Sequence, residues 1–262
     1  MKLARNMKDP IIVGTTIAIN YQLIKTLGFV RCKDFKIPIK TLLSTVEEHS
    51  TSYPLVSVYA LNCIGSLITQ SDDLYRDCKS TITSKTFFKQ ILKILNIQGE
   101  LIDHVSVIEG SNYGFTSVGL FDGIFNFLSC LLEKISRVKE ELKLFYLHMK
   151  EVQLDKSIIY ILKSLSPKTQ LSPKGFLIYL MFVCDCAYAR KYGSTFHQEL
   201  VNATNIKILV RLLSEQQFKS MTEWPQNIGG GTLGGELLVS QVIRILQLPF
   251  SGSVSFFHLT LI

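Results

Sequence analysis

The spacing of the apolar residues constrains the fold more than any other feature of this sequence. In the stretch PLVSVYALNCIGSLI, apolar side chains recur at steps of three and four residues from Leu55 to Ile68. The stretches DKSIIYILKSL and NIKILVRLLSEQQF have the same spacing. Such steps place side chains on one face of an α-helix, whereas a half-buried strand needs strict alternation. Because strand signals are few, the pattern predicts an all-α protein.

Prolines and polar connections divide the chain into predicted helices. Pro10, Pro38, Pro54 and Pro173 stand at or near the start of apolar stretches, where proline suits the first turn of a helix. The predicted helices span residues 11–30, 38–48, 54–69, 84–96, 117–135, 137–149, 151–165, 173–191, 205–214, 216–222 and 234–247. Helices of this length with short polar connections fit an α-solenoid better than a four-helix bundle.

The helices also suggest how the chain is organised. Helix pairs recur about every 40 residues, as in armadillo and HEAT units, although no residue repeats in register. We therefore expect one armadillo/HEAT-like α-solenoid of irregular helical repeats over residues 1–262, with a candidate sub-boundary near 166–173. An irregular all-α domain is the alternative. The apolar ending PFSGSVSFFHLTLI predicts a truncated product, or a fragment whose missing neighbour covers those residues.

Composition and charge limit the functions to be considered. The chain has 262 residues, of which 47% are hydrophobic and 19% charged, so it can bury a sizeable core and is not expected to be disordered. The net charge is +7, but lysines and arginines occur one or two at a time. A nucleic-acid interface would need clustered basic residues, so no nucleic-acid partner is expected.

The most apolar runs are too short or too polar to cross a membrane. Residues Phe176 to Cys184 are uninterrupted, but Asp185 ends the run well short of the ~18–20 residues that a span requires. The run VGLFDGIFNFLSCLL contains Asp122 and Asn126. Both runs predict buried helices and no membrane span. The polar start MKLARNMKDP is no secretory signal, so a cytoplasmic location is expected.

The six cysteines form no recognisable metal or redox motif. There is no C-x-x-C pair, and no cysteine–histidine spacing matches a zinc site. Cys184 and Cys186 lie one residue apart in an apolar run, so on a helix they point in different directions. The prediction is free, buried thiols in a reducing compartment.

A glycine-rich stretch, GGGTLGG, raises the question of nucleotide binding. Gly229, Gly231 and Gly234 satisfy G-x-G-x-x-G. A dinucleotide site needs a buried strand before the glycines, but here the polar stretch FKSMTEWPQN precedes them. A P-loop needs G-K-[S/T], and no lysine follows these glycines. The stretch predicts a mobile connection between helices that ends where the helix 234–247 begins.

Catalytic motifs are absent from the sequence. It has no H-R-D, D-F-G, V-A-I-K or A-P-E motif of protein kinases and no G-x-S-x-G elbow; Ser111 and Ser194 neighbour glycine without triad partners. His197 and Glu199 are two residues apart and do not share a helix face, so His197 is expected to be a partly exposed helix residue. No catalytic, cofactor-binding or metal-binding residue is predicted, and no cofactor. Trp224 is expected to pack the end of its helix against the next repeat, with a role as a partner anchor as the alternative.

The C-terminal third of the chain contains an ordered series of features: a G-S-T-F turn at Gly193–Phe196 before a short helix, a leucine-rich helix at Ile206–Leu213, Trp224, the glycines Gly229–Gly231, and a helix that ends in Leu248–Phe250. In this series, residues 175–250 resemble part of the armadillo-like C-terminal region of Fused-type serine/threonine kinases. The first 170 residues agree with the family only in being helical.

The resemblance implies a docking role rather than catalysis. The kinase domain of the family has no counterpart here, so the chain is expected to be a non-catalytic, protein-binding scaffold. The implied partners are kinesin-like proteins or components of Hedgehog signalling and cilia, and the cilium or cytoskeleton is a further implied location. Nothing in the sequence specifies the oligomeric state. Two alternatives remain: a fragment of an active serine/threonine kinase whose catalytic domain lies outside this chain, and a generic armadillo-like adaptor unrelated to Fused.

Overall fold

The computed structural model describes residues 9–34, 36–95, 120–164, 173–189, 191–223 and 231–250. All regular elements in these ranges are helices: α1 (Pro10–Leu27), α2 (Ile39–His49), α3 (Pro54–Gln70), α4 (Asp72–Ile82), α5 (Lys85–Leu95), α7 (Leu120–Ile135), α8 (Lys139–Glu151), α9 (Leu154–Ser164), α10 (Pro173–Tyr188), α11 (Ser194–Leu200), α12 (Ala203–Arg211), α13 (Glu215–Glu223) and α14 (Gly231–Leu246). The all-α prediction is confirmed for this part of the chain. The predicted sub-boundary and the apolar C-terminal ending lie mainly or wholly outside the described residues.

The proline positions mark helix starts as predicted. Pro10, Pro54 and Pro173 are the first residues of α1, α3 and α10, and Pro38 directly precedes α2. Proline suits this place because the first backbone N–H groups of a helix have no intrahelical partner. The Asp9 side chain caps α1 by accepting a hydrogen bond of 2.9 Å from the Ile11 N–H.

One helix, α4, was not predicted, and a second, α11, was expected only as the short helix that the family resemblance implies. In α4, between the predicted helices 54–69 and 84–96, the buried residues are Tyr75, Cys78 and Ile82, and most of the rest is polar. Ser71 caps α4 by accepting a hydrogen bond of 3.3 Å from the Leu74 N–H. The second helix, α11, has only seven residues. Both apolar patterns are too short for periodicity to detect.

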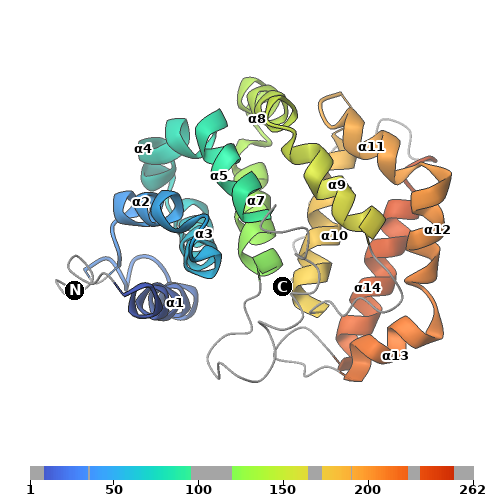
Figure 1. Cartoon of the computed structure of the whole chain (residues 1–262), viewed down its shortest axis with the longest axis horizontal. Helices are drawn as coiled ribbons and strands as arrows, with labels where there is room; N and C mark the ends of the chain where they lie inside the picture. Colours follow the sequence, from blue (N-terminus) through green and yellow to red (C-terminus); the bar gives the residue numbers. More distant parts are fainter. Residues whose placement is uncertain are drawn as a thin grey trace.

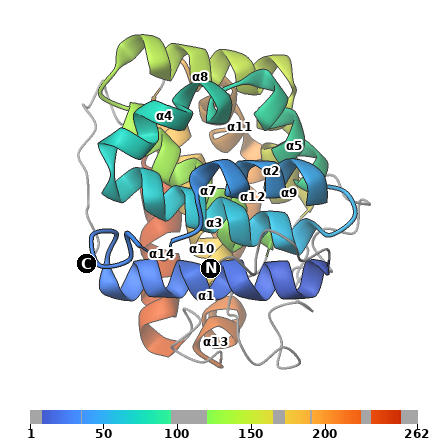
Figure 2. The same cartoon turned by 90° about the vertical axis from the view of Figure 1, so that its left-hand side faces the viewer.

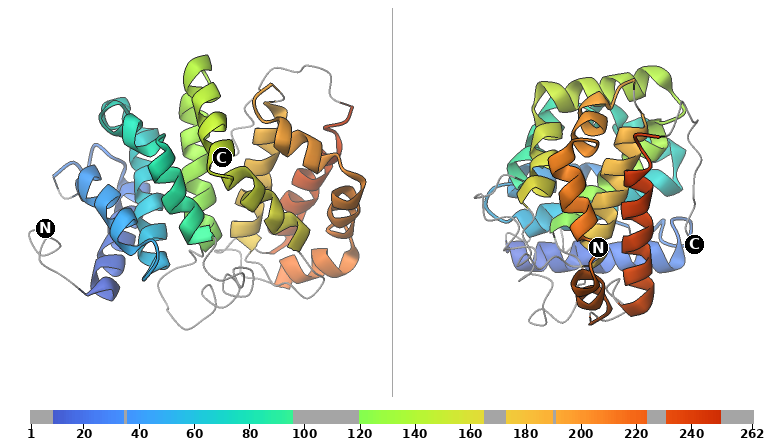
Figure 3. Two further views of the ribbon diagram at one scale, coloured as in Figure 1. Left: turned by 45° about the horizontal axis from the view of Figure 1, so that its top comes forward. Right: turned by 90° about the vertical axis from the view of Figure 1, so that its right-hand side faces the viewer.

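The helices form two rows. In the first row, α1 packs on α3, α3 on α7, α7 on α10 and α10 on α14, and these helices follow one another from left to right in Figure 1. The second row contains α2, α5, α8, α9 and α11. Three of these helices pack on the first row: α2 on α3, α8 on α7 and α11 on α10. The other two, α5 and α9, contact each other, and both also contact α8. The second row comes forward when the top of the molecule is turned toward the viewer (Figure 3). Each segment of chain therefore packs mainly on its neighbours.

The first row twists along its length. When the molecule is viewed from its left-hand side, α1 runs across the view while α14 runs up it (Figure 2). Successive helices of the row are thus rotated relative to one another. A small rotation at each packing step adds up along a stack of this kind.

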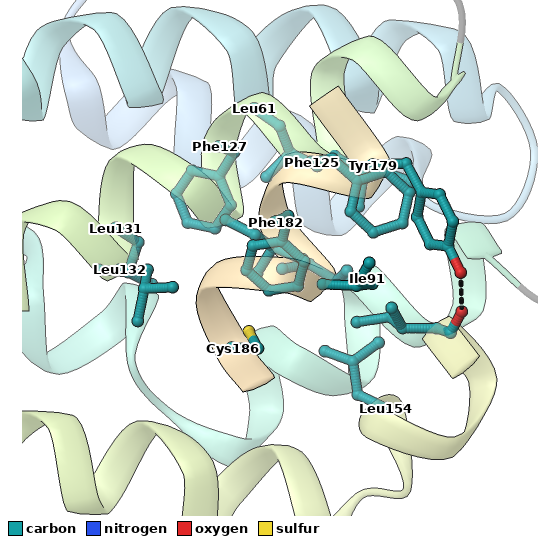
Figure 4. Close-up of a cluster of buried hydrophobic side chains, with 14 of the residues drawn as sticks. Leu61, Ile91, Phe125, Phe127, Leu131, Leu132, Leu154, Tyr179, Phe182 and Cys186 are labelled. Carbon is teal, nitrogen blue, oxygen red and sulfur yellow. Dashed lines mark hydrogen bonds between the residues drawn. The ribbon is translucent and has the colours of Figure 1, made fainter. Parts of the chain in front are cut away.

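Aromatic side chains join the two rows in the middle of the molecule (Figure 4). The Phe125 ring of α7 lies with its centroid 5.0 Å from that of Tyr179 and 5.8 Å from that of Phe182, both on α10. The Tyr179 hydroxyl donates a hydrogen bond of 3.0 Å to the Ile158 carbonyl of α9. Buried aromatic rings of this kind contribute strongly to core packing. The prediction that α7 and α10 are buried helices is confirmed.

The charged residue inside α10 has a partner on α14. The Asp185 carboxylate, half-buried, accepts a hydrogen bond of 2.7 Å from the Arg244 guanidinium. The Arg244 guanidinium also lies 5.2 Å from the centre of the Tyr188 ring. Pairing explains how α10 carries a carboxylate in an otherwise apolar run. None of the helices described is both long and apolar enough to span a bilayer.

Two glycines let α3 and α7 approach closely. A β-carbon at Gly123 of α7 would lie 2.2 Å from Val58 Cγ1 and 2.6 Å from the Val58 carbonyl oxygen of α3. A β-carbon at Gly65 of α3 would lie 3.3 Å from the Phe127 α-carbon. At these two places the backbone of one helix touches the other helix directly, so no side chain fits between them.

Replacing Gly123 by alanine should therefore destabilise the protein. We expect Gly123→Ala to lower the free energy of unfolding by about 1–3 kcal/mol, because the new methyl group meets backbone as well as side-chain atoms. Gly14→Ala is the matched control, since a β-carbon there would lie 3.2 Å from Val56 Cγ2, a methyl group that can move. Urea denaturation of both variants measures the effect, and equal stabilities would contradict this account of the α3–α7 contact.

Candidate functional site

A pocket lies across four helices of the first row. It has a volume of about 290 Å³. Its lining residues come from α1, α3, α7 and α10: Tyr21, Lys25, Asn62, Ser66, Thr69, Gln70, Asn126, Cys130 and Ile178. We call this cavity the first-row pocket. It is the best-defined candidate site among the described residues, because it gathers polar side chains from parts of the chain that are distant in sequence.

Helical spacing brings these side chains to one place. Tyr21 and Lys25 lie one turn apart on α1, and Asn126 and Cys130 one turn apart on α7. On α3, Asn62 and Ser66 are likewise four residues apart, with Thr69 and Gln70 on the next turn. The helices α1, α3 and α7 therefore each bring two or more polar or sulfur-bearing side chains to the pocket, while α10 contributes Ile178.

Hydrogen bonds fix two of the amides in this pocket. Asn126 Nδ2 of α7 donates a bond of 2.8 Å to Asn62 Oδ1 of α3. The Phe29 backbone N–H donates a bond of 2.7 Å to Gln70 Oε1. Both amide oxygens thus accept hydrogen bonds from within the protein, which holds each amide in one orientation.

None of the described residues that line the pocket is a carboxylate or a histidine, whereas Tyr21, Lys25 and Cys130 carry ionisable groups. Burial raises the pKa of the Cys130 thiol, an effect that the Thr69 hydroxyl only partly opposes by hydrogen bonding. Cys130 is therefore protonated at neutral pH and is a poor nucleophile.

The other cysteines are also unreactive. All six cysteines are free thiols, as predicted. Five of them are buried, which confirms the predicted burial, whereas Cys130 is only partly buried. Burial raises the pKa of Cys63 and of Cys184 to about 12, and that of Cys78 to about 11. These thiols act as small apolar side chains.

The glycine-rich stretch is partly helical, which corrects the prediction of a loop. The helix α14 begins at Gly231 rather than at residue 234, so Gly231, Gly234 and Gly235 belong to its first turns. A β-carbon at Gly235 would lie 2.6 Å from the Phe218 ring of α13, so this glycine admits the ring against the α14 backbone. The element before the stretch is the helix α13, where a dinucleotide site would need a strand. Gly229, like Trp224 and Ser111, lies outside the described residues.

The remaining singled-out residues do not assemble into a site. His197 lies half-buried in α11, as predicted, and its Nε2 has no hydrogen-bond partner among the described residues. Glu199 pairs with Lys163 of α9 at 2.8 Å. Ser194 is the exposed first residue of α11, so the G-S-T-F turn includes the start of that helix. The described residues contain no group of three or more His, Cys, Asp or Glu side chains that could hold a metal ion.

Sequence reasoning did not identify the first-row pocket. Its only visible signal was the presence of asparagine in apolar helices, at positions 62 and 126. An amide inside an apolar run needs a hydrogen-bonding partner when it is buried. The sequence contains no indication that these two amides, which are 64 residues apart, bond to each other.

Comparison with known proteins gives one partial similarity. A stretch of 89 residues, 34% of this chain, is 32% identical to the serine/threonine-protein kinase TIO of Arabidopsis thaliana. The match spans only 6% of the length of that protein. No family model matches the chain, and no solved structure does. The all-helical character of the described residues and the small matched share agree with a region outside a kinase domain.

The bond between Asn62 and Asn126 should contribute measurably to stability. We expect Asn126→Ala to lower the free energy of unfolding by about 1–3 kcal/mol, because it leaves the buried oxygen of Asn62 without a donor. A double-mutant cycle with Asn62→Ala, followed by urea denaturation, isolates the pairwise energy. Strictly additive effects of the two substitutions would show that the amides do not interact.

Proposed function

We propose that this chain is a non-catalytic, armadillo/HEAT-like scaffold of a Fused-type protein and that it binds other proteins. The observation that carries the proposal is the pair of helix rows, in which each helix of the first row packs on the next. Stacked helix pairs of this kind present an extended surface, which repeat proteins use to bind partners.

The twist of the first row and the position of the pocket support this interpretation. In repeat proteins, the small rotation from one unit to the next creates an extended surface that binds partners. The first-row pocket takes residues from α1, α3, α7 and α10, so a ligand there would contact several repeats at once. The described lining contains neither a carboxylate nor a histidine, which favours binding over chemistry.

The identity of the partners rests on family resemblance. The features of residues 175–250 resemble Fused-type proteins, and the partial similarity to TIO supports that assignment. On this basis we propose kinesin-like proteins, or components of Hedgehog signalling and cilia, as partners. The corresponding place of action is the cytoplasm, with the cilium or the cytoskeleton as sites of assembly.

The similarity to a named kinase also favours a second candidate function. The chain would then be a piece of an active serine/threonine kinase whose catalytic domain lies outside it. The two candidates differ in whether an in-frame kinase domain accompanies this sequence in its gene. In both cases the chain itself supplies binding.

The purified chain should not bind ATP. A dinucleotide site needs a glycine-rich turn that directly follows a strand. The glycines of α14 instead belong to a helix, and the described element before it is the helix α13. Isothermal titration calorimetry with ATP and magnesium should give no saturable heat. Saturable binding in the micromolar range would contradict the non-catalytic assignment.

The chain should form a direct complex with a kinesin-like protein of the same organism. We expect co-elution in size-exclusion chromatography and saturable binding by calorimetry when both proteins are purified. A chain carrying Lys89→Gln, an exposed change on α5 in the second row, should bind equally well. If kinesin-like, Hedgehog-pathway and ciliary proteins all fail to bind while an unrelated protein does, the generic adaptor is the better description.

A further inference from the structure

We propose that a group of exposed lysines on and beside α8 binds an acidic segment of a partner protein. These lysines, which we call the lysine cluster, are Lys139, Lys143 and Lys150 of α8 and Lys191 of the turn before α11. The inference rests on the proposed scaffold function and names the chemistry of one class of partner. It follows from the arrangement of the lysines, from the nearby acids and from two exposed leucines.

Helical spacing places three of these lysines on one side of α8. Four residues follow one another at steps of four, three and four, and so share that side: Lys139, Lys143, Tyr146 and Lys150. The Tyr146 hydroxyl donates a hydrogen bond of 3.4 Å to the Cys186 carbonyl, so this side of α8 faces α10. The helix itself forms the top edge of the molecule in Figure 1 and runs across the top of Figure 2.

A pair of stacked tyrosines adds the fourth lysine. The ring centroids of Tyr146 and Tyr192 are 6.4 Å apart, and the two rings are nearly parallel, at 14°. The Lys191 ammonium lies 5.7 Å from the centre of the Tyr192 ring. Since Tyr146 stands between Lys143 and Lys150 on α8, Lys191 extends the cluster beyond that helix. The structure thus gathers lysines that are scattered in the sequence.

The acids nearest the cluster are occupied by other partners. Glu141 accepts a bond of 2.6 Å from the Tyr75 hydroxyl and one of 3.1 Å from the Lys79 ammonium, both of α4. Glu151 pairs with Lys85 of α5 at 2.6 Å. These carboxylates therefore lie on the side of α8 that faces α4 and α5. No lysine of the cluster forms an ion pair with a carboxylate of the described residues.

A second exposed stripe runs beside the lysines. It has the same steps of four, three and four and consists of Glu140, Leu144, Leu147 and Glu151. The two leucines are 42% and 46% exposed. A partner segment along α8 can pack apolar side chains on the leucines and place its carboxylates against the lysines. Glu140 and Glu151 repel acids from the leucine stripe, so they direct the carboxylates to the lysine side.

The composition of this surface favours a protein over phosphate-bearing ligands. Arginine is the residue that binds phosphate in a bidentate manner, and α8 contains none. Exposed leucines offer a contact for apolar side chains, which a nucleic-acid backbone lacks. A helix that lies in a membrane surface buries a wide apolar face in the lipid. The apolar face of α8, with Leu142, Phe145 and Met149, is instead buried in the core.

Paired substitutions test the lysine cluster. Lys143→Gln combined with Lys150→Gln removes two exposed charges from one side of α8, and Lys191→Gln tests the fourth lysine separately. Lys89→Gln combined with Lys93→Gln is the matched control, because it removes two exposed lysines, one turn apart, from α5. All these positions are exposed, so the variants should fold, and circular dichroism checks this.

The binding experiment uses peptides selected on the unaltered chain. A display library of random peptides of about 12 residues, which as a helix match the length of the lysine side of α8, is selected, and enriched peptides are synthesised with blocked ends. We expect binders that combine several acidic residues with an apolar one. The double variant of α8 should weaken their binding about tenfold, because two ion pairs are lost. Lys191→Gln should weaken it about threefold, and the α5 control should leave it unchanged.

A change in the leucine stripe tests the apolar part of the contact. Leu147→Gln, at a half-exposed position, should weaken peptide binding about fivefold, because it removes apolar area that the partner covers. Higher salt should weaken the peptide binding of the unaltered chain more than that of the double variant, since salt screens exposed charges.

Several results would overturn the inference. They are a selection without binders, binders without acidic residues, equal binding by the α8 double variant and its control, and no effect of Leu147→Gln. Tighter, cluster-dependent binding of single-stranded RNA or of phosphatidylserine vesicles would assign the surface to phosphates instead. The scaffold function is tested separately by the complex with a whole partner protein. If that partner binds the unaltered chain and all variants equally, only the lysine cluster is wrong.

Discussion

The close contact between α3 and α7 is the interaction on which the rest of the arrangement depends. The helices α1 and α2 pack on α3, while α8 and α10 pack on α7, so this contact joins the N-terminal part of the described chain to the remainder. It is unusually intimate because Gly65 and Gly123 leave no side chain between the two helices. A contact of this kind holds the two helices in one relative position, because close-packed interiors deform little.

The same contact builds the candidate site. The Asn62–Asn126 bond joins the two helices at their shared boundary, and both residues also line the first-row pocket. One pair of amides therefore belongs both to the helix contact and to the candidate site. A change in the distance between α3 and α7 would alter both, because a hydrogen bond weakens steeply when its geometry is disturbed.

The sequence predicts those parts of the fold that depend on one segment alone. The helices α3, α7 and α10 are long and apolar, so periodicity is enough to find them. In α4 only three buried residues mark the inner face, and α11 is too short for a repeat to show. The predicted start of α14 was too late, because glycine disfavours helices. In the structure the glycine-rich segment is helical from Gly231, and the Phe218 ring packs against Gly235. The pocket could not be predicted, because it needs the relative placement of four helices that are distant in sequence.

The ion pair between Asp185 and Arg244 has a consequence for how the end of the first row is assembled. The apolar surfaces of α10 and α14 alone would tolerate several axial positions of one helix against the other. A shift of α14 by one turn, about 5.4 Å, would separate the guanidinium from the half-buried carboxylate. The loss of this pair would then disfavour that arrangement. The ion pair, together with the bond of 3.2 Å that the Tyr188 hydroxyl donates to the Arg244 carbonyl, therefore favours one register of the last helix, much as a polar residue does in a coiled coil.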